Sequence, residues 1–175
     1  AASDVYKRQV VYSPYMLGGV VMNIAVICGG LSSERDVSIT SGTNAARALR
    51  EQGHKVVLVD LFYGYDGEYN DPKELFEREQ QDVQYSVKEE TPDFDKLLAE
   101  GKGSRIGGNV IEICRAADIC FLALHGQDGE DGKIQATLDM HGVKYTGSGY
   151  LGSAIAMNKE LSVSYTHLRA HETSQ

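Results

Sequence analysis

Three polar segments carry the side chains whose types and spacing suit chemistry. Glu34 lies in GGLSSERD (29–36), His125 begins HGQDGEDG (125–132), and Lys159 lies in SAIAMNKEL (153–161). A glutamate beside a helix start can hold an ammonium group, or it can simply complement the helix dipole. A histidine can donate to an anionic intermediate or a substrate carboxylate, or it can be structural. A lysine is more often solvated than functional, so residue type alone leaves both alternatives open at each position.

The acidic residues of HGQDGEDG raise the question of a metal site. A calcium loop requires Asp or Asn at its third and fifth positions, and counted from Asp128 these positions hold Glu130 and Gly132. A glycine-rich turn in which Asp128, Glu130 and Asp131 cap the helix that follows is instead expected to account for the acids in part. The sequence therefore predicts no metal site in this segment, and capping leaves His125 unexplained.

Two further motifs are incomplete. Gly29 and Gly30 follow an apolar run, but no third glycine completes a GxGxxG pattern, which disfavours a nicotinamide cofactor with Asp60 on its ribose. His167 and His171 have the i, i+4 spacing of zinc ligands on a helix but lack the glutamate of HExxH. Neither motif supports a cofactor or metal site.

Both ends of the chain read like translated sequencing-adapter DNA. DVYKRQ (4–9) and VSYTH (163–167) can be encoded by one DNA element in its two orientations. We therefore expect residues 1–21 to be a non-native or upstream tail and 162–175 to be an adapter-derived tail, with Met22 as the natural start. This origin also accounts for His167 without any chemistry.

Short apolar segments alternate with amphipathic ones through the core of the sequence. Strands are predicted at 23–30, 55–62, within 117–126 and at 143–147, and helices at 37–53, 109–117, 131–142 and 148–161. This alternation predicts an α/β fold with a doubly wound, mainly parallel sheet. Ligands collect at the carboxyl ends of such strands, so GGLSSERD, HGQDGEDG and TGSG are expected to converge there.

The domain organisation follows from the same pattern. We expect one α/β domain over residues 22–147, with residues 148–161 beginning a second region. Residues 63–108 lack strong periodicity and are predicted to be an insertion, with a helix around 73–79 and a flexible connection at 101–108.

Composition excludes several classes of partner. The net charge of −8 argues against binding a nucleic-acid backbone, and no apolar run reaches the length of a membrane helix. Cys28, Cys114 and Cys120 lie in or beside apolar runs without CxxC spacing, and an odd number fits no disulfide framework. These observations favour a soluble protein of the reducing cytoplasm.

The motifs together resemble the D-alanine–D-alanine ligase family of the ATP-grasp superfamily. The matching segments are AVICGGLSSERDVSITSG, HGQDGEDGKIQATLDMHGVKYTGSG and SAIAMNK, in that order and spacing. The middle segment fits the family signature HGxxGEDG and the residues that follow it through Ala136. The resemblance covers about Met22 to Leu161 and implies a Rossmann-like domain that precedes an ATP-grasp region.

The resemblance also implies roles for the three candidate residues. Glu34 matches the glutamate that anchors the ammonium of the first D-alanine, His125 the histidine of the substrate pocket, and Lys159 a lysine that reaches the ATP phosphates. The implied reaction phosphorylates the carboxylate of one D-alanine, and the amine of a second then attacks the acyl phosphate. Partners would be D-alanine and ATP with Mg²⁺, in a homodimer that supplies peptidoglycan synthesis.

Several parts of the family are not present in this sequence. The nucleotide-clamping domain, the magnesium ligands and the arginine near the transferred phosphate belong to later segments. We therefore expect the 175-residue chain to be inactive alone, and its preference among D-alanine, D-lactate and D-serine to be undetermined. Two alternatives stay open, namely another ATP-grasp ligase and a non-catalytic α/β ligand-binding module.

Overall fold

The computed structural model describes residues 19–78, 93–100, 104–159 and 163. Its elements run β1 (Asn23–Cys28), α1 (Arg35–Glu51), β2 (Lys55–Asp60), α2 (Glu74–Glu77), α3 (Phe94–Glu100), α4 (Val110–Ala116), β3 (Ile119–Leu122), α5 (Lys133–Met140) and α6 (Tyr150–Met157). Among these residues, no helix is both long and apolar enough to cross a membrane. Most of the expected tails, residues 1–18, 162 and 164–175, lies outside the described part, so the adapter origin and the start at Met22 stay predictions.

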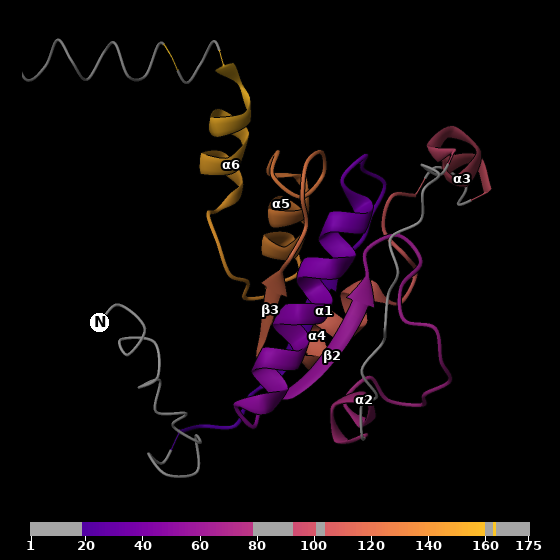
Figure 1. Ribbon diagram of the computed structural model, residues 1–175, viewed down its shortest axis with the longest axis vertical. Coiled ribbons are helices and arrows are strands. Elements are labelled where there is room, and N and C mark those ends of the chain that lie inside the picture. Colours follow the sequence, from indigo (N-terminus) through magenta and orange to yellow (C-terminus); the bar gives the residue numbers. More distant parts are fainter. Residues whose placement is uncertain (1–18, 79–92, 101–103, 160–162, 164–175) are drawn as a thin grey trace, which may run out of the picture.

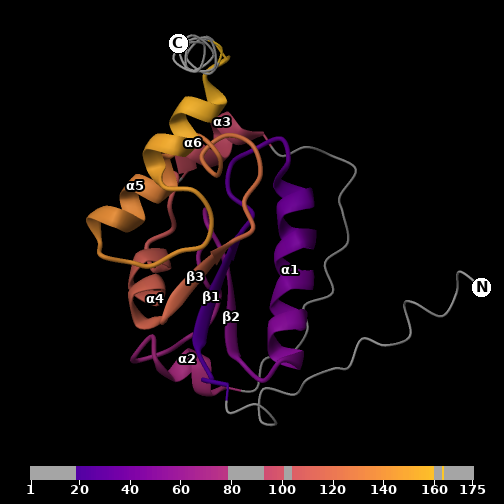
Figure 2. The same cartoon turned by 90° about the vertical axis from the view of Figure 1, so that its left-hand side faces the viewer.

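The sheet confirms the predicted α/β class. In the described part of the chain it has parallel strands, which run in the same direction (Figure 1), in the order β2-β1-β3, so β1 lies at the centre (Figure 2). Asn23 pairs with Lys55 and Cys28 with Asp60, while Ile24 of β1 pairs with Ile119 of β3. All strands therefore end at the same edge, which brings the loops after β1 and β3 together.

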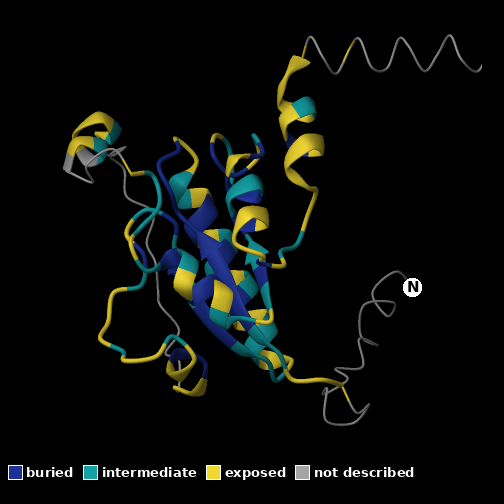
Figure 3. Cartoon of the chain, turned by 180° about the vertical axis from the view of Figure 1, so that it is seen from behind, coloured by how far each residue is buried: buried dark blue, intermediate teal, exposed yellow. Residues whose placement is uncertain are grey.

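Helices cover both faces of the sheet. Figure 2 shows α1 on one side of the strands and α4 and α5 on the other. Alternate residues of β1 divide between two apolar cores: Ile24, Val26 and Cys28 join the core that includes Ile39 and Ala46 of α1, whereas Ala25 and Ile27 join the core of α4 and α5. The strands are largely buried and the outward helix faces exposed (Figure 3), as a doubly wound sheet requires.

The first helix ends as the sequence predicts, at a glycine. Gly53 has a φ of +85°, and its N–H donates to the carbonyl of Arg50, while the N–H of His54 donates to that of Leu49. A left-handed residue at this place closes a helix by satisfying its last carbonyl groups, and glycine adopts that conformation without a steric penalty. The turn then leads directly into β2.

The predicted strand at 143–147 is wrong. Only an isolated parallel bridge between Cys120 and Tyr145 forms there, supported by bonds from Cys120 N to Lys144 O (2.8 Å) and from Thr146 N to Cys120 O (2.9 Å). Two residues further along β3, the N–H of Leu122 donates to the Thr146 side chain (3.2 Å) instead of to a backbone carbonyl. The side chain thereby ends the ladder after a single bridge.

The insertion is partly ordered by contacts with the sheet. The predicted helix around 73–79 is confirmed as α2, and α3 is additional, while residues 79–92 and 101–103 lie outside the described part. Residues 104–108, expected to be flexible, are held in place because Gly107 N donates to Leu61 O at 2.9 Å. A Cβ on Gly107 would lie 2.7 Å from Gly64 N, so the two segments are in close contact.

Candidate active site

Two loops meet at the carboxyl edge of the sheet: the Glu34 loop (29–34), which follows β1, and the His125 loop (123–132), which follows β3. Gly126 allows their close approach, since it has a φ of +71° and a Cβ there would lie 2.7 Å from Ser32 Oγ. The same position is 3.5 Å from Glu34 Oε1. Glu34 therefore lies beside the residue that follows His125, as the predicted convergence of the loops requires.

Glu34 immediately precedes α1. Its backbone N–H donates to Ser32 Oγ (3.1 Å), and its carbonyl accepts from Ser38 N (2.9 Å). Its side chain is exposed and makes no capping hydrogen bond to the helix. The carboxylate thus has room to accept a cationic group at a helix start, where a negative charge is also favoured by the dipole.

His125 is contacted on both ring nitrogens. Its Nε2 lies 3.2 Å from the hydroxyl of Ser41 on α1, and its Nδ1 lies 4.0 Å from Glu130 Oε1. About a third of the side chain is exposed (34%), so the ring stays open to a ligand at the edge of the sheet. The ring is therefore oriented by polar contacts from two elements.

Ser38 joins the two loops through the helix. Its hydroxyl accepts from Gly29 N (2.9 Å) at the end of β1 and donates to Ala123 O (2.8 Å) beyond β3. Ser38 is completely buried, so both bonds are protected from water. The start of α1, the Glu34 loop and the His125 loop are consequently fixed to one another.

Asp60 has a structural role. Arg35 donates to both of its carboxylate oxygens, at 2.5 Å and 3.3 Å, and to Gly30 O at 2.9 Å. The carboxylate also accepts from the N–H groups of Phe62 (2.8 Å) and Tyr63 (3.0 Å). With its oxygens engaged in this way, Asp60 is not placed as the acid that binds a ribose.

The acids of the His125 loop have three different partners, so capping at the start of α5 accounts for them only in part. Asp131 accepts from the backbone N–H of Lys133 (3.2 Å) and from its ammonium (2.7 Å). Burial alone would raise the pKa of Asp131, but these bonds from Lys133 outweigh it and lower the pKa. Glu130 faces His125, and Asp128 pairs with Arg105 and, at 3.5 Å, with Lys133.

Arg105 is a residue that the sequence did not single out. Its guanidinium donates to the carboxylate of Asp128 and, at 3.0 Å, to Leu31 O in the Glu34 loop. Asp128 is buried and has a left-handed φ of 71°, which its pairing with Arg105 supports. Arg105 thus braces both loops from the insertion, although GKGSRIGG carries no local sign of such a contact.

Lys159 is separated from the other two candidates. It lies two residues beyond α6, is exposed, and within the described part of the chain forms no hydrogen bond or ion pair with Glu34 or His125. The helix α6 rises above the carboxyl ends of the strands (Figure 1), with Gly132 packed against its first turn at Tyr150. Lys159 therefore follows a helix that lies at the carboxyl edge of the sheet, as the two loops do, but it does not contact Glu34 or His125.

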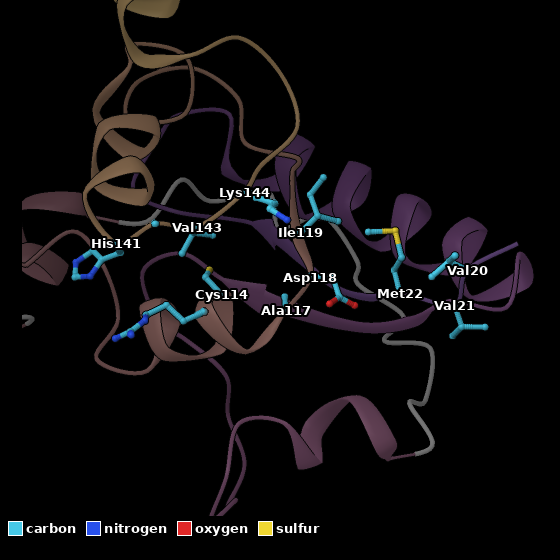
Figure 4. Close-up of a pocket in the computed structure, with 12 residues that line it drawn as sticks. Val20, Val21, Met22, Cys114, Ala117, Asp118, Ile119, His141, Val143 and Lys144 are labelled. Atoms are coloured by element: carbon cyan, nitrogen blue, oxygen red, sulfur yellow. The ribbon is translucent and has the colours of Figure 1, made fainter.

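Two hollows differ in their relation to this edge. One, of about 370 Å³, borders Glu130, Thr146 and Ser148 between the His125 loop and α6. A larger one of about 740 Å³ lies at the opposite end of the sheet, beside Met22 and Asp118 (Figure 4). The smaller hollow adjoins the candidate site, and the larger one does not. Within the described residues, no group of three or more His, Cys, Asp or Glu side chains is placed to hold a metal ion.

The parallel sheet in the order β2-β1-β3, with helices on both faces, defines a Rossmann-like α/β domain. Its family is identified by a match of residues 23–148 to the model described as D-ala D-ala ligase N-terminus. Since this match covers most of the chain, the chain belongs to that family.

Individual relatives agree with this assignment. The chain is 46% identical over 144 residues to the D-alanine–D-alanine ligase of Lacticaseibacillus casei strain BL23, covering 81% of this chain and 40% of the relative. With that of Pediococcus pentosaceus the identity is 44% over 145 residues, covering 81% and 41%. A crystal structure of the Bacillus anthracis ligase complexed with ATP has a TM-score of 0.53 and 28% identity, with 86% of this chain and 37% of that chain covered. The chain thus spans about 40% of the length of these two curated relatives.

Proposed function

We propose that this chain is the amino-terminal part of an ATP-dependent D-alanine–D-alanine ligase, which joins two D-alanine molecules for peptidoglycan synthesis. The observation that carries the proposal is the placement of Glu34 against Gly126, beside His125, in a chain with the family match. The names of the curated relatives, and the ATP complex of a structural neighbour, support the substrate and the nucleotide. We further propose that the intact enzyme is a cytoplasmic homodimer, as the family resemblance implies.

Each candidate residue would contribute through charge and position. The carboxylate of Glu34 would bind the ammonium of the first D-alanine, which leaves that substrate's carboxylate near the His125 ring. One carboxylate oxygen would then take the γ-phosphoryl group of ATP, with ADP leaving, to give an acyl phosphate. The amine of a second D-alanine would attack the acyl carbon, phosphate would leave, and the amine would lose a proton. Holding charged reactants in fixed geometry supplies much of such catalysis.

The nucleotide and the metal would depend largely on other segments. Lys159 is the described residue that we assign to ATP, whose phosphates its exposed ammonium would contact. Mg²⁺ would neutralise phosphate charge, but the described residues provide no cluster of ligands for it. The family resemblance implies that its ligands belong to other segments of the intact ligase.

The proposal is tested by D-alanine-dependent release of phosphate from ATP in the intact ligase that carries these residues. Glu34→Gln is expected to raise KM for D-alanine by about tenfold, as loss of one charged contact does, with KM for ATP nearly unchanged. Glu51→Gln, which alters an exposed carboxylate at the far end of α1, is the matched control. Equal KM values in the two variants would contradict the role of Glu34.

The substrate and the boundaries of the activity need separate measurements. A panel of D-alanine, D-serine and D-lactate as second substrate distinguishes this ligase from another ATP-grasp enzyme. The 175-residue chain alone is expected to release no phosphate, because it spans about 40% of its relatives. Turnover by that chain would contradict this expectation, whereas an inactive intact protein that still binds D-alanine would favour a binding module.

A further inference from the structure

One face of α1 presents polar side chains to the carboxyl edge of the sheet. Glu34, Ser38 and Ser41 are spaced i, i+4 and i+7, which places them in a row along the helix. Glu34 adjoins Gly126, Ser38 holds the ends of β1 and β3, and Ser41 Oγ lies 3.2 Å from His125 Nε2. The first two have a proposed ligand-binding or evident structural role, and Ser41 has neither.

We propose that Ser41 is a positioning residue that fixes the orientation and the tautomer of the His125 ring, with Glu130 acting on the opposite nitrogen. The ring is about one third exposed, so packing alone does not hold it. Its polar contacts come from α1 on one side and from its own loop on the other. The use of His125 in a reaction rests on the proposed function, but the geometry of the ring does not.

The chemistry of the two neighbours makes their effects complementary. At 4.0 Å the Glu130 carboxylate is too far from Nδ1 for a direct hydrogen bond, but its negative charge favours a proton on the ring nitrogen that faces it. A hydroxyl both donates and accepts, so Ser41 can donate to the bare Nε2 of that neutral ring. If the ring becomes protonated, Ser41 accepts from Nε2 instead. Ser41 therefore holds the ring in either state, and without the hydroxyl Nε2 has lost this partner.

The tautomer can be read directly from the ¹⁵N resonances of the neutral imidazole in the 175-residue chain. The wild-type His125, identified with His125→Gln, is expected to carry its proton on Nδ1. Ser41→Thr and Ser41→Val are a matched pair of equal shape, of which only threonine keeps the hydroxyl. The Thr variant should retain the wild-type resonances, and the Val variant should shift them toward a mixture of tautomers.

Two comparisons make the result specific. Thr40→Ala removes the hydroxyl of the preceding residue, which donates to Asp36 O within the helix, and should leave the His125 resonances unchanged. Backbone amide spectra of each variant establish that it is folded before the imidazole is compared. Unchanged His125 resonances in folded Ser41→Val, or a wild-type proton on Nε2, would overturn the proposal.

Kinetics of the intact ligase provide the second readout. Ser41→Val is expected to lower kcat/KM for D-alanine by about tenfold, as loss of a contact that orients a functional histidine does, and Ser41→Thr should restore most of it. If the resonances respond but the intact protein does not ligate D-alanine, the proposed function fails and the positioning of the ring stands. If the intact protein ligates D-alanine but the Thr and Val variants are equally active, the positioning role of Ser41 is contradicted and the proposed function stands.

Discussion

The guanidinium of Arg105 donates to the carboxylate of Asp128, 23 residues further along the chain, and to the carbonyl of Leu31. These bonds connect the insertion to both loops of the candidate site. Asp128 is 6% exposed and has a left-handed backbone, a conformation that non-glycine residues rarely adopt. The insertion therefore helps to set the geometry of the Glu34 and His125 loops.

Replacing Arg105 should weaken the whole domain. Arg105→Ala leaves Asp128 buried with only Lys133 nearby, and because the arginine itself is partly exposed, a loss of about 2 kcal/mol in the free energy of unfolding is expected. Urea unfolding of the chain measures this. Arg115→Ala, at an exposed position of α4, should change the free energy by less than about 0.5 kcal/mol. Equal effects would show that the Arg105 contacts contribute nothing measurable.

Two adjacent glycines should respond oppositely to alanine. A Cβ on Gly107 would lie 2.7 Å from Gly64 N and 2.8 Å from Phe62 O, and these backbone atoms cannot move aside easily. Gly107→Ala is therefore expected to cost about 1–3 kcal/mol. At Gly108 nothing lies within 4 Å, so Gly108→Ala should be neutral or slightly stabilising. Thermal or urea unfolding of the two variants compares them, and a tolerated Gly107→Ala would disprove the close contact.

Alkaline pH should remove the stabilising contribution of the buried Cys28 thiol to the free energy of unfolding. Burial, and then the Asp60 carboxylate, raise the pKa of Cys28 from 9.0 to about 12 against the opposing effect of Arg35. Because the pKa is raised on folding, the stabilising contribution is complete below pH 9 and is lost as the pH rises toward 12.

A comparison with Cys28→Ala isolates that contribution from those of other groups. The difference in unfolding free energy between the wild-type chain and this variant should shrink by about 1.4 kcal/mol between about pH 8 and about pH 10. Urea unfolding at both values provides the measurement. A difference that stays constant would mean that the thiol titrates normally in the folded chain.

Lys159 and Glu34 should affect different substrates of the intact ligase. Lys159→Met is expected to raise KM for ATP by about tenfold, since one ammonium contact to phosphate is lost, and to leave KM for D-alanine nearly unchanged. The proposed effect of Glu34→Gln is the reverse. Lys144→Met, which removes an exposed lysine at the other end of the sheet, is the control. A common effect of Lys159→Met on both KM values would argue against a role confined to ATP.

Local patterns were enough to predict the layered part of the fold. Apolar runs of strand length predicted β1, β2 and β3, and Gly53 marked the end of α1 because a left-handed closing residue is a local requirement. The convergence of the Glu34 and His125 loops also followed, since parallel neighbouring strands end at one edge. These features depend on residues that are close in sequence or on the rule of parallel pairing.

Contacts between distant segments could not be predicted in this way. The partner of Arg105 is 23 residues away, and a glycine-rich segment around it has the composition of a linker. Ser41 contacts His125 across 84 positions, which requires α1 to lie against the end of β3. The strand predicted at 143–147 is absent for a related reason. A contact between distant residues decides it, because the Thr146 side chain accepts from Leu122 N in place of a backbone carbonyl.

The buried hydroxyl of Ser38 has a consequence for how this contact evolves. Both of its partners, Gly29 N and Ala123 O, are backbone atoms: every amino acid except proline provides the N–H, and every amino acid provides the carbonyl. Replacement of the side chain at position 123 therefore leaves the bond intact, and no compensating change at a second site can restore a lost serine. The selective constraint falls on position 38 alone, so pairwise covariation among relatives would not detect one of the main connections between the two loops.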